Sequence, residues 1–499
     1  MALWSCLLTG QQVHFVSSAA DDGEGTLRSI LQLANPFDTI RFQPGLDTVF
    51  LTSGELTINK SVYLEGNENV TFIKRDGSSP LFRLVRITST DTLRVSFVRM
   101  GFTGGSALTG TEATVNGEGG GAVMAGDSVH DLSFEWCEFI NNMSGDGVSD
   151  GWNGEEYFAG KGGHGGAIYT NSKGRLKDCL LKKNFCGTGG QCHKIVWNWY
   201  DLIGEDGGDG GAIYATANLV MENCRLDSNR AGNGRSAIGY GSDYVGAYAG
   251  KGGDGGGLVC TGDSLVITAC EFTCNIAGSS GHAQSNQTAS SKHGGNGGAV
   301  VGSGSAMAIS NSVFTGNRAG NGGSVLSGGD QASGSDGGDG GALYGMGSVM
   351  VVAGSEFSSN MSGNGGNGSE NYGGDGGNGG SGGGICAVSS EARFTGCWIE
   401  NNKAGNGGNG PGGMGSSLKM NGGSGGGICI SSATNDCYLV SCMVKSNISG
   451  DGGAHLAMRP GASGGHGGGM AYFEPSGLFT CHLVNCDVSF NAAGFARVP

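Results

Sequence analysis

The chain has 499 residues, of which 105 are glycine and 7 are proline, and its formal net charge at pH 7 is −15. This length is large for one compact core and ordinary for an elongated repeat protein. The acidic balance and the lack of a Lys/Arg run argue against nucleic acid and anionic membranes as partners, and no apolar stretch is long enough to predict a transmembrane helix.

The N-terminal part of the chain contains one short helical pattern. Its opening, "MALWSCLLTGQQ", has a brief apolar run with no basic residues before it, so we do not identify it as a secretion signal. Further on, Thr26 is a suitable N-cap for an amphipathic turn or two. The apolar residues of that turn are Leu27, Ile30, Leu31 and Leu33.

From residue 116 to 499 the chain repeats itself nine times, with a period of about 44 residues. Residues 1–115 are expected to form an N-terminal cap and the first coils. One landmark is the small residue after each glycine cluster: Ala122, Ala167, Ala212, Gly257, Ala299, Ala342, Gly384, Gly427 and Gly469. The other is the asparagine that ends each copy: Asn142, Asn184, Asn229, Asn275, Asn317, Asn360, Asn402, Asn447 and Asn491. Two independent landmarks make the repeat signal strong.

Each copy follows the pattern apolar-x-apolar-x-x-[Cys/Ser]-x-apolar-x-x-Asn. One example is Leu265, Ile267, Cys270, Phe272 and Asn275. Apolar residues two apart lie on one face of a strand, and the x-x pair changes the phase by one, which indicates a corner. A helix would need spacings of three and four throughout.

The pattern therefore predicts three short strands in each copy, the first of them in the "GGAIY" segment. Gly174 and Ala392 are its weak members. No copy can bury its inner face alone, so the copies must stack with their strands in parallel. The predicted fold is all-β, a single-stranded right-handed parallel β-helix with long glycine-rich loops on one side.

The asparagines at one corner of successive coils predict a structural ladder. Asparagine tolerates the left-handed conformation of a tight corner, and stacked amides can bond along the column. Sequons at Asn142, Asn360 and Asn447 use ladder residues and should be inaccessible to glycosylation. Asn286 and Asn367 lie in loops and are the better candidates.

Two stretches carry a family resemblance. The segment "GGGAVMAGDSVHDLSFEWCEFINN" resembles the repeats of chlamydial polymorphic outer membrane proteins. The segments "DDGEGTLRSILQLANPFDTIRFQPGL" and "LTSGELTINKSVYLEG" resemble the opening of bacterial and algal right-handed β-helix surface proteins. The resemblance implies that Gly25–Asn35 is a helix capping the rod, and that the protein is an adhesive or structural one, extracellular or on the cell surface. The chain lacks the C-terminal membrane barrel of the autotransporter members, so we expect a fragment or one subunit of something larger.

One column of the glycine clusters contains titratable residues, among them His164, Asp209, Asp254 and Asp339. Neighbouring carboxylates could bind calcium or act as acid and base. The interpretation we prefer is that small polar residues suit a glycine turn and face water. We therefore assign no catalytic residue, no metal and no cofactor.

The cysteines also fall into columns, since Cys137, Cys179, Cys224 and Cys270 occupy one inward position in successive coils. Parallel side chains hold their Cβ atoms slightly too far apart for a disulfide, so we favour buried free thiols. The spacings do not indicate zinc.

The loops run for about twenty residues between each ladder asparagine and the next glycine cluster. We interpret the glycine cluster as a hinge between the rod and the variable loops. The first three loops carry aromatic residues: Trp152, Tyr157, Phe158, Trp197, Trp199, Tyr200, Tyr240, Tyr244 and Tyr248. Clustered exposed aromatics mark a contact surface for glycans or proteins. The alternative is that they pack back over the rod.

These observations favour a non-enzymatic extracellular or cell-surface protein with a structural or adhesive role. Its partners would be glycans or other protein subunits, with self-assembly into a filament as a variant. The alternative from another class is a polysaccharide lyase or hydrolase, since hydrolysis needs paired carboxylates at a defined separation.

Overall fold

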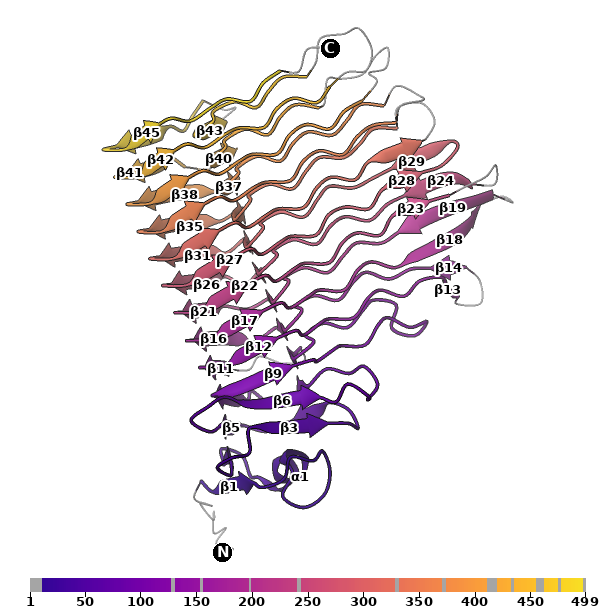
Figure 1. Cartoon of the computed structure of the whole chain (residues 1–499), viewed down its shortest axis with the longest axis vertical. Helices are drawn as coiled ribbons and strands as arrows, with labels where there is room; N and C mark the ends of the chain where they lie inside the picture. The colour runs from indigo at the N-terminus through magenta and orange to yellow at the C-terminus, as the bar shows by residue number, and fades with distance from the viewer. Residues whose placement is uncertain are drawn as a thin grey trace, which may run out of the picture.

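The structure is a computed structural model. It describes residues 11–126, 131–152, 156–196, 199–239, 244–327, 332–369, 374–410, 420–431, 435–454, 462–473 and 477–496. Within these ranges the chain forms the predicted right-handed parallel β-helix, a rod with the N-terminus at one end and the last coils at the other (Figure 1). No helix in the described ranges is long and apolar enough to cross a membrane.

Three long parallel sheets form the walls of the rod; each complete coil contributes one strand to each sheet, and β1, β2 and β3 precede the first complete coil. The 13-stranded sheet consists of β1 (Val13–Val16), β2 (Thr39–Phe42), β5 (Val62–Glu65), β8 (Arg94–Val98), β11 (Asp131–Glu135), β16 (Lys173–Lys177), β21 (Leu219–Glu222), β26 (Ser264–Thr268), β31 (Ala306–Ser310), β35 (Val349–Ala353), β38 (Glu391–Thr395), β41 (Cys437–Val440) and β44 (Cys481–Val484). The 11-stranded sheet consists of β4 (Leu56–Ile58), β7 (Val85–Ile87), β10 (Val123–Ala125), β15 (Ile168–Thr170), β20 (Ile213–Ala215), β25 (Leu258–Cys260), β30 (Val300–Ser303), β34 (Leu343–Met346), β37 (Ile385–Val388), β40 (Ile428–Ser431) and β43 (Met470–Phe473). The 12-stranded sheet consists of β3 (Thr48–Leu51), β6 (Thr71–Arg75), β9 (Met100–Thr103), β12 (Glu138–Ile140), β17 (Leu180–Lys182), β22 (Arg225–Asp227), β27 (Glu271–Thr273), β32 (Val313–Thr315), β36 (Glu356–Ser358), β39 (Trp398–Glu400), β42 (Met443–Lys445) and β45 (Asp487–Ser489).

A short helix, α1 (Leu27–Leu33), caps the N-terminal end of the rod as predicted. The side chain of Thr26 is the N-cap and accepts the N–H of Ser29. Leu27 and Leu31 face the core, but Leu33 is 70% exposed, so its assignment to the apolar face was wrong. The helix ends at Leu33, and this residue lies beyond the turn that covers the core.

The rod interior is filled by the inward residues of all three sheets. Phe272, Phe314 and Phe357 stack in successive coils at centroid distances of 4.7 and 4.6 Å. Gly174, one of the weak positions of the repeat, points inward, and the side chain of Leu219 in the next coil occupies the space beside it. Apolar residues in register in successive coils thus form a continuous column.

At the corner of each coil one residue has a left-handed backbone conformation, but this residue is not the ladder asparagine. In all nine copies the positive φ falls on the residue before the asparagine, for example φ 58° at Ser359. The expectation that the asparagine itself adopts this conformation was wrong. Its role is hydrogen bonding: the Oδ1 of Asn360 accepts both the backbone N–H and the side-chain Nδ2 of Asn317, at 2.9 and 3.0 Å. The asparagines from Asn142 to Asn447 are fully buried.

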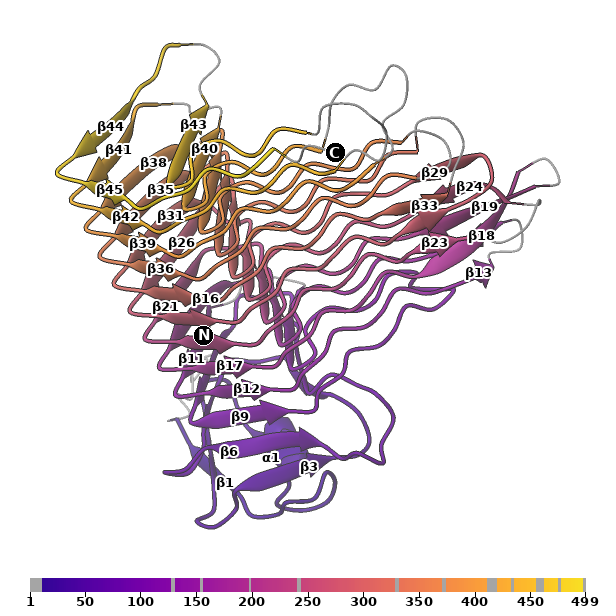
Figure 2. The same ribbon diagram turned by 45° about the horizontal axis from the view of Figure 1, so that its top comes forward.

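The glycine-rich loops form a flat extension on one side of the rod, which we call the glycine wing (Figure 2). Each coil contributes an outgoing leg, which follows the ladder asparagine, and a return leg, which leads into the 11-stranded sheet. In the coil of Asn360 these legs are 361–369 and 374–384. Legs of successive coils lie side by side, so the wing has one layer of outgoing legs and one layer of return legs.

Small sheets close the far end of the wing in several coils. They consist of β13 (Gly151–Trp152) with β14 (Tyr157–Phe158), of β18 (Gln191–Val196), β19 (Trp199–Gly204), β24 (Tyr244–Tyr248) and β29 (Thr288–Ser290), and of β23 (Ala237–Ile238), β28 (Ala283–Gln284) and β33 (Val325–Ser327). Between them lies a small core that includes Ala247, Ala283 and Val325. The division of the chain at residue 115 stays a prediction, and strand pairing continues across it, because β7 pairs with β10.

Candidate functional sites on the glycine wing

The legs of the wing repeat every three residues. The backbone N–H of Gly363 donates to the carbonyl of Gly338 in the opposite layer at 2.8 Å. The N–H of Asn364 donates to the Oδ1 of Asn321 in the preceding coil at 2.9 Å. The N–H of Gly365 donates to the carbonyl of Asn406 in the next coil at 2.9 Å. A three-residue period whose bonds all leave the chain is typical of a polyproline II type helix.

Glycine is needed at most inner positions of the legs because the backbones pack without room for a side chain there. A Cβ at Gly363 would overlap the carbonyl oxygen of Gly320 in the same layer, and one at Gly365 would overlap that of Gly377 in the opposite layer. Only the third position of each triplet points outward. The glycine cluster is therefore part of a closely packed, hydrogen-bonded array, and our expectation that it forms a hinge was wrong.

The titratable column of the glycine clusters lies on the outer face of the return layer. Its members accept the backbone N–H of the next coil at 2.6–3.1 Å. They are His164, Asp209, Asp254, Asn296, Asp339, Ser381 and Ser424, and the column ends at His466, whose N–H bonds Ser424. What these residues share is an oxygen or nitrogen acceptor on a short side chain, and that requirement explains their mixture of types.

Burial against the rod shifts the ionisation of this column. Burial and the nearby Asp254 carboxylate raise the pKa of Asp209 to about 7, and burial raises that of Asp339 to about 6. Burial also lowers the pKa of His164 to about 4. The Nδ1 of His164 accepts the N–H of Asp209 at 2.9 Å, which places the proton of the neutral ring on Nε2.

We call the base of the wing, where the titratable column meets the 11-stranded sheet, the wing root. It also contains two tyrosines that the repeat pattern did not single out. Tyr169 and Tyr214 project from the outward face of the 11-stranded sheet, with ring centroids 5.6 Å apart, and His164 stacks on Tyr214 at 4.6 Å. The repeated "AIY" was the available signal. A hollow of ≈ 330 Å³ lies beside His164 and Tyr169, with Lys161 on its rim.

Several lysines neutralise the acidic residues at the wing root. The Nζ of Lys251 lies 2.6 Å from Asp254, and the Nζ of Lys292 lies 2.7 Å from Asp206. Asp254 also accepts the N–H of Asn296 through its other oxygen. Both oxygens of Asp254 are thus bonded, and one oxygen of Asp209 accepts the N–H of Asp254. No group of three or more His, Cys, Asp or Glu among the described residues could hold a metal.

The aromatic residues of the first loops lie at the far end of the wing, away from the rod (Figure 1). Trp152 and Tyr157 pair across the β13–β14 hairpin with centroids 4.8 Å apart, and they are 41% and 38% exposed. Tyr248 in β24 is 40% exposed. We call these three residues the aromatic edge. They do not pack over the rod.

The other aromatic candidates are placed less fully. Phe158 is half-buried in β14. Trp199, Tyr200 and Tyr244 lie in β19 and β24, where β19 pairs with β24 in parallel. Trp197 and Tyr240 lie outside the described residues.

Every cysteine in the described ranges is a free thiol. In the inward column the backbone N–H of Cys224 donates to the Sγ of Cys270 at 3.3 Å, and Ser312 takes the same place in the next coil. Burial raises the pKa of Cys186 to about 12, which makes a reactive thiolate unfavourable there.

The two loop sequons differ in their surroundings. Asn286 and Asn367 are both exposed, but the Oδ1 of Asn367 accepts the N–H of Asn409 at 2.9 Å and belongs to an outer column of the wing. Ser369, the third residue of that sequon, is fully buried. Asn286 is therefore the more accessible glycosylation candidate.

No protein-family model matches this chain, and no curated protein matches it in sequence. Among solved structures, it is similar to the A-module of a mannuronan C-5 epimerase from Azotobacter vinelandii, at 10% identity and a TM-score of 0.38, over 95% of this chain and 99% of that one. It is also similar to a periplasmic alginate epimerase, at 10% identity and a TM-score of 0.33, over 92% and 87%. A third similar structure is a surface adhesin of Streptococcus pneumoniae, at 11% identity and a TM-score of 0.23, over 85% and 87%.

Proposed function

We propose that the chain is a non-enzymatic extracellular or cell-surface protein with a structural or adhesive role. The observation that carries this proposal is the solvent-exposed pair of Trp152 and Tyr157 at the far end of a rigid wing. Large aromatic side chains held in water on a stiff support are typical of a contact surface for glycans or proteins. The resemblance of the repeats to chlamydial polymorphic outer membrane proteins supports the same assignment.

The chemistry of the wing root supports a structural role for its titratable column. A general base needs a free lone pair near its substrate. The Nδ1 of His164 is occupied by a backbone N–H, and both oxygens of Asp254 are bonded, one to a backbone N–H and one to Lys251. The same positions are held by Asn296 and Ser381 in other coils, where no acid–base chemistry is available.

Binding of the whole chain to a glycan array and to immobilised cells tests the proposal. Trp152→Ala and Tyr157→Ala should each weaken the binding of the strongest ligand about tenfold, as loss of an aromatic anchor does. Trp398→Ala is the matched control, because Trp398 is 47% exposed on the outward face of the rod. Equal losses in all three variants, or no loss in any, would contradict a role for the aromatic edge.

A polysaccharide lyase or hydrolase is the second candidate, because His164, Asp209 and Tyr214 gather beside a hollow at the wing root. Incubation with uronate and neutral polysaccharides, followed by assays for new reducing ends and unsaturated products, separates the two. Turnover that disappears in Asp209→Asn would replace the structural proposal by the enzymatic one. Asn keeps the acceptor oxygen for the Asp254 N–H, so this variant should keep the fold.

A further inference from the structure

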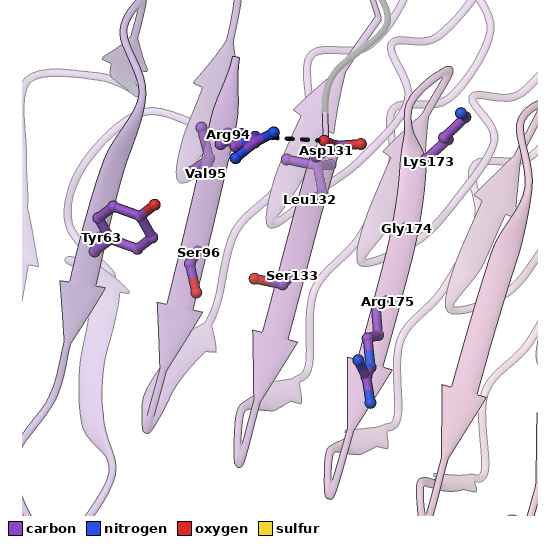
Figure 3. Close-up of a pocket in the computed structure, with 10 residues that line it drawn as sticks. All are labelled: Tyr63, Arg94, Val95, Ser96, Asp131, Leu132, Ser133, Lys173, Gly174 and Arg175. Carbon is purple, nitrogen blue, oxygen red and sulfur yellow. Dashed lines mark ion pairs between the residues drawn. The ribbon is translucent and has the colours of Figure 1, made fainter. Parts of the chain in front are cut away.

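We propose that a groove on the outward face of the 13-stranded sheet binds an acidic polysaccharide lying along the rod. The groove lies over β5, β8, β11 and β16 (Figure 3). It is separate from the wing and does not depend on the function proposed for the aromatic edge.

Two rows of outward side chains form the walls of the groove. Arg94, Asp131 and Lys173 are in register on neighbouring strands and make one row. Two residues further along the strands, the second row consists of Tyr63, Ser96, Ser133 and Arg175. The backbone between the rows is the floor, and the hollow measures ≈ 340 Å³.

Two small residues, Ser96 and Ser133, lie in the middle of the second row and leave space there between the larger Tyr63 and Arg175. Ser96 and Ser133 face solvent one coil apart, with Tyr63 beyond one of them and Arg175 beyond the other. Neither hydroxyl has a hydrogen-bond partner among the described residues. Beyond Arg175, the same row continues with Val220, which presents no polar group. From Tyr63 to Ala308, this row therefore offers a ligand serine hydroxyls only at Ser96 and Ser133.

The groove is cationic on an acidic chain. Three cations, Arg94, Lys173 and Arg175, face one carboxylate, that of Asp131. Arg94 reaches Asp131 only at 3.8 Å, and Lys173 has no ion pair with any residue that the structure describes. Arg175 pairs with Glu222 of the next coil at 3.3 Å, on the side away from the groove. An anion in the groove would gain charge-assisted hydrogen bonds from side chains that are not fully paired.

The shape and the side-chain types favour a sugar polymer. Tyr63 offers an amphipathic ring at one end, suited to the apolar face of a sugar ring, and the serine hydroxyls can bond sugar hydroxyls. The rows run along the rod, so polar groups recur at the strand spacing of about 4.8 Å. A polymer of acidic sugars can meet this row with successive residues, whereas a small anion would use only one cation.

The test measures binding of three oligosaccharides of equal length to the whole chain by calorimetry: an oligogalacturonate, a heparin fragment and a cello-oligosaccharide. We expect the first two to bind, more weakly as salt rises, and the neutral one not to bind. Their relative affinities separate carboxylate from sulfate recognition. Ser133→Leu should abolish binding, because it fills the groove without changing charge. Lys173→Ala and Arg175→Ala should each weaken it about tenfold.

Matched controls lie on the same row of the same sheet. Ala308→Leu places the same bulk, and Arg393→Ala removes the same charge, in coils far from the groove. Both should bind as the unaltered chain does. The proposal is overturned if Ser133→Leu binds normally, if the neutral oligosaccharide binds equally well, or if none of the three oligosaccharides binds. A loss in Trp152→Ala with none in Ser133→Leu would assign the glycan to the aromatic edge instead.

Discussion

The rod and the glycine wing are two solutions to stacking the same coils. In the rod, side chains such as Phe314 and Ile309 fill a dry interior. In the wing, the two layers leave room between them for small side chains only, such as that of Ser362, and bonds between backbones join the legs. The rod draws its stability from apolar burial, whereas the wing depends on directional hydrogen bonds in three directions and on the absence of Cβ atoms.

This difference explains why one repeat contains two kinds of sequence. Burial tolerates exchanges among apolar residues of similar size, so the rod positions vary among Leu, Ile, Val, Met and Phe. Close contact of backbones tolerates glycine and, at a few inner positions, small residues such as Ser362 and Ala404, so the legs vary mainly at the outward third position. Each region should therefore fail under a different kind of substitution.

The largest expected effect is in the rod. Phe314→Ala removes a fully buried ring stacked between two others, and should lower the free energy of unfolding by about 3–5 kcal/mol. Denaturant titration measures the loss. Val313→Ala is the control, because Val313 is in the same strand and points outward. Equal effects would contradict the division between core and surface in this strand.

A glycine of the wing should come next. A Cβ at Gly320 would overlap the carbonyl oxygen of Gly278, so Gly320→Ala should cost about 1–3 kcal/mol. Hydrogen exchange should show faster exchange of wing amides and unchanged protection of rod amides. Gly77→Ala, where a Cβ would meet no atom within 4 Å, should change neither. A loss of protection spread evenly over the rod would show that the two regions unfold together.

The wing root should respond to pH. Asp339 has a pKa raised to about 6 by burial and by Asp336, above its value of 3.8 in an unfolded chain. The folded state thus holds this proton more tightly, and stability should fall as the pH rises from about 4 through about 6. In Asp339→Asn, the fall in the free energy of unfolding over this pH interval should be smaller by about 1 kcal/mol, a figure that allows for solvent around a half-buried carboxyl. Melting temperatures between pH 4 and pH 8 would measure it, and a steeper slope in the variant would contradict it.

The smallest effect is expected on the outer face of the wing. Asn321→Ala removes the Oδ1 that accepts the N–H of Asn364. Asn321 is exposed, so water can replace that acceptor and the cost should stay near about 0.5 kcal/mol. Its control is Asn317→Ala in the buried ladder, which leaves the N–H of Asn275 without an acceptor. If Asn321→Ala lowers the free energy of unfolding as much as Asn317→Ala does, the outer columns stabilise the protein as strongly as the buried ladder.

The sequence predicted the rod well because spacing alone decides which side chains face inward. Cys270, Phe272 and Asn275 occupy the strand and corner that their spacing indicated. It did not predict the wing, because the triplets Gly-Gly-x were taken for loop composition. Their period of three was present in "GNGGNG", but its meaning depends on neighbouring coils that bond only once the legs are stacked.

The candidate sites were predicted unevenly for a related reason. The exposed pair Trp152 and Tyr157 stood out by residue type. Tyr63, Ser96 and Ser133 did not, because nothing in their local sequence shows that they share a row. That relation appears only when the register between strands 33 and 37 residues apart is known.

The three-residue period also determines how such a protein could change its reach. One added triplet in each leg of a coil would leave every bond direction in phase and would not disturb the rod. At about 3.1 Å per residue, it would carry the far end outward by about 9 Å. The length of the wing can therefore change in steps of one triplet in each leg, while the sequence of the rod stays the same.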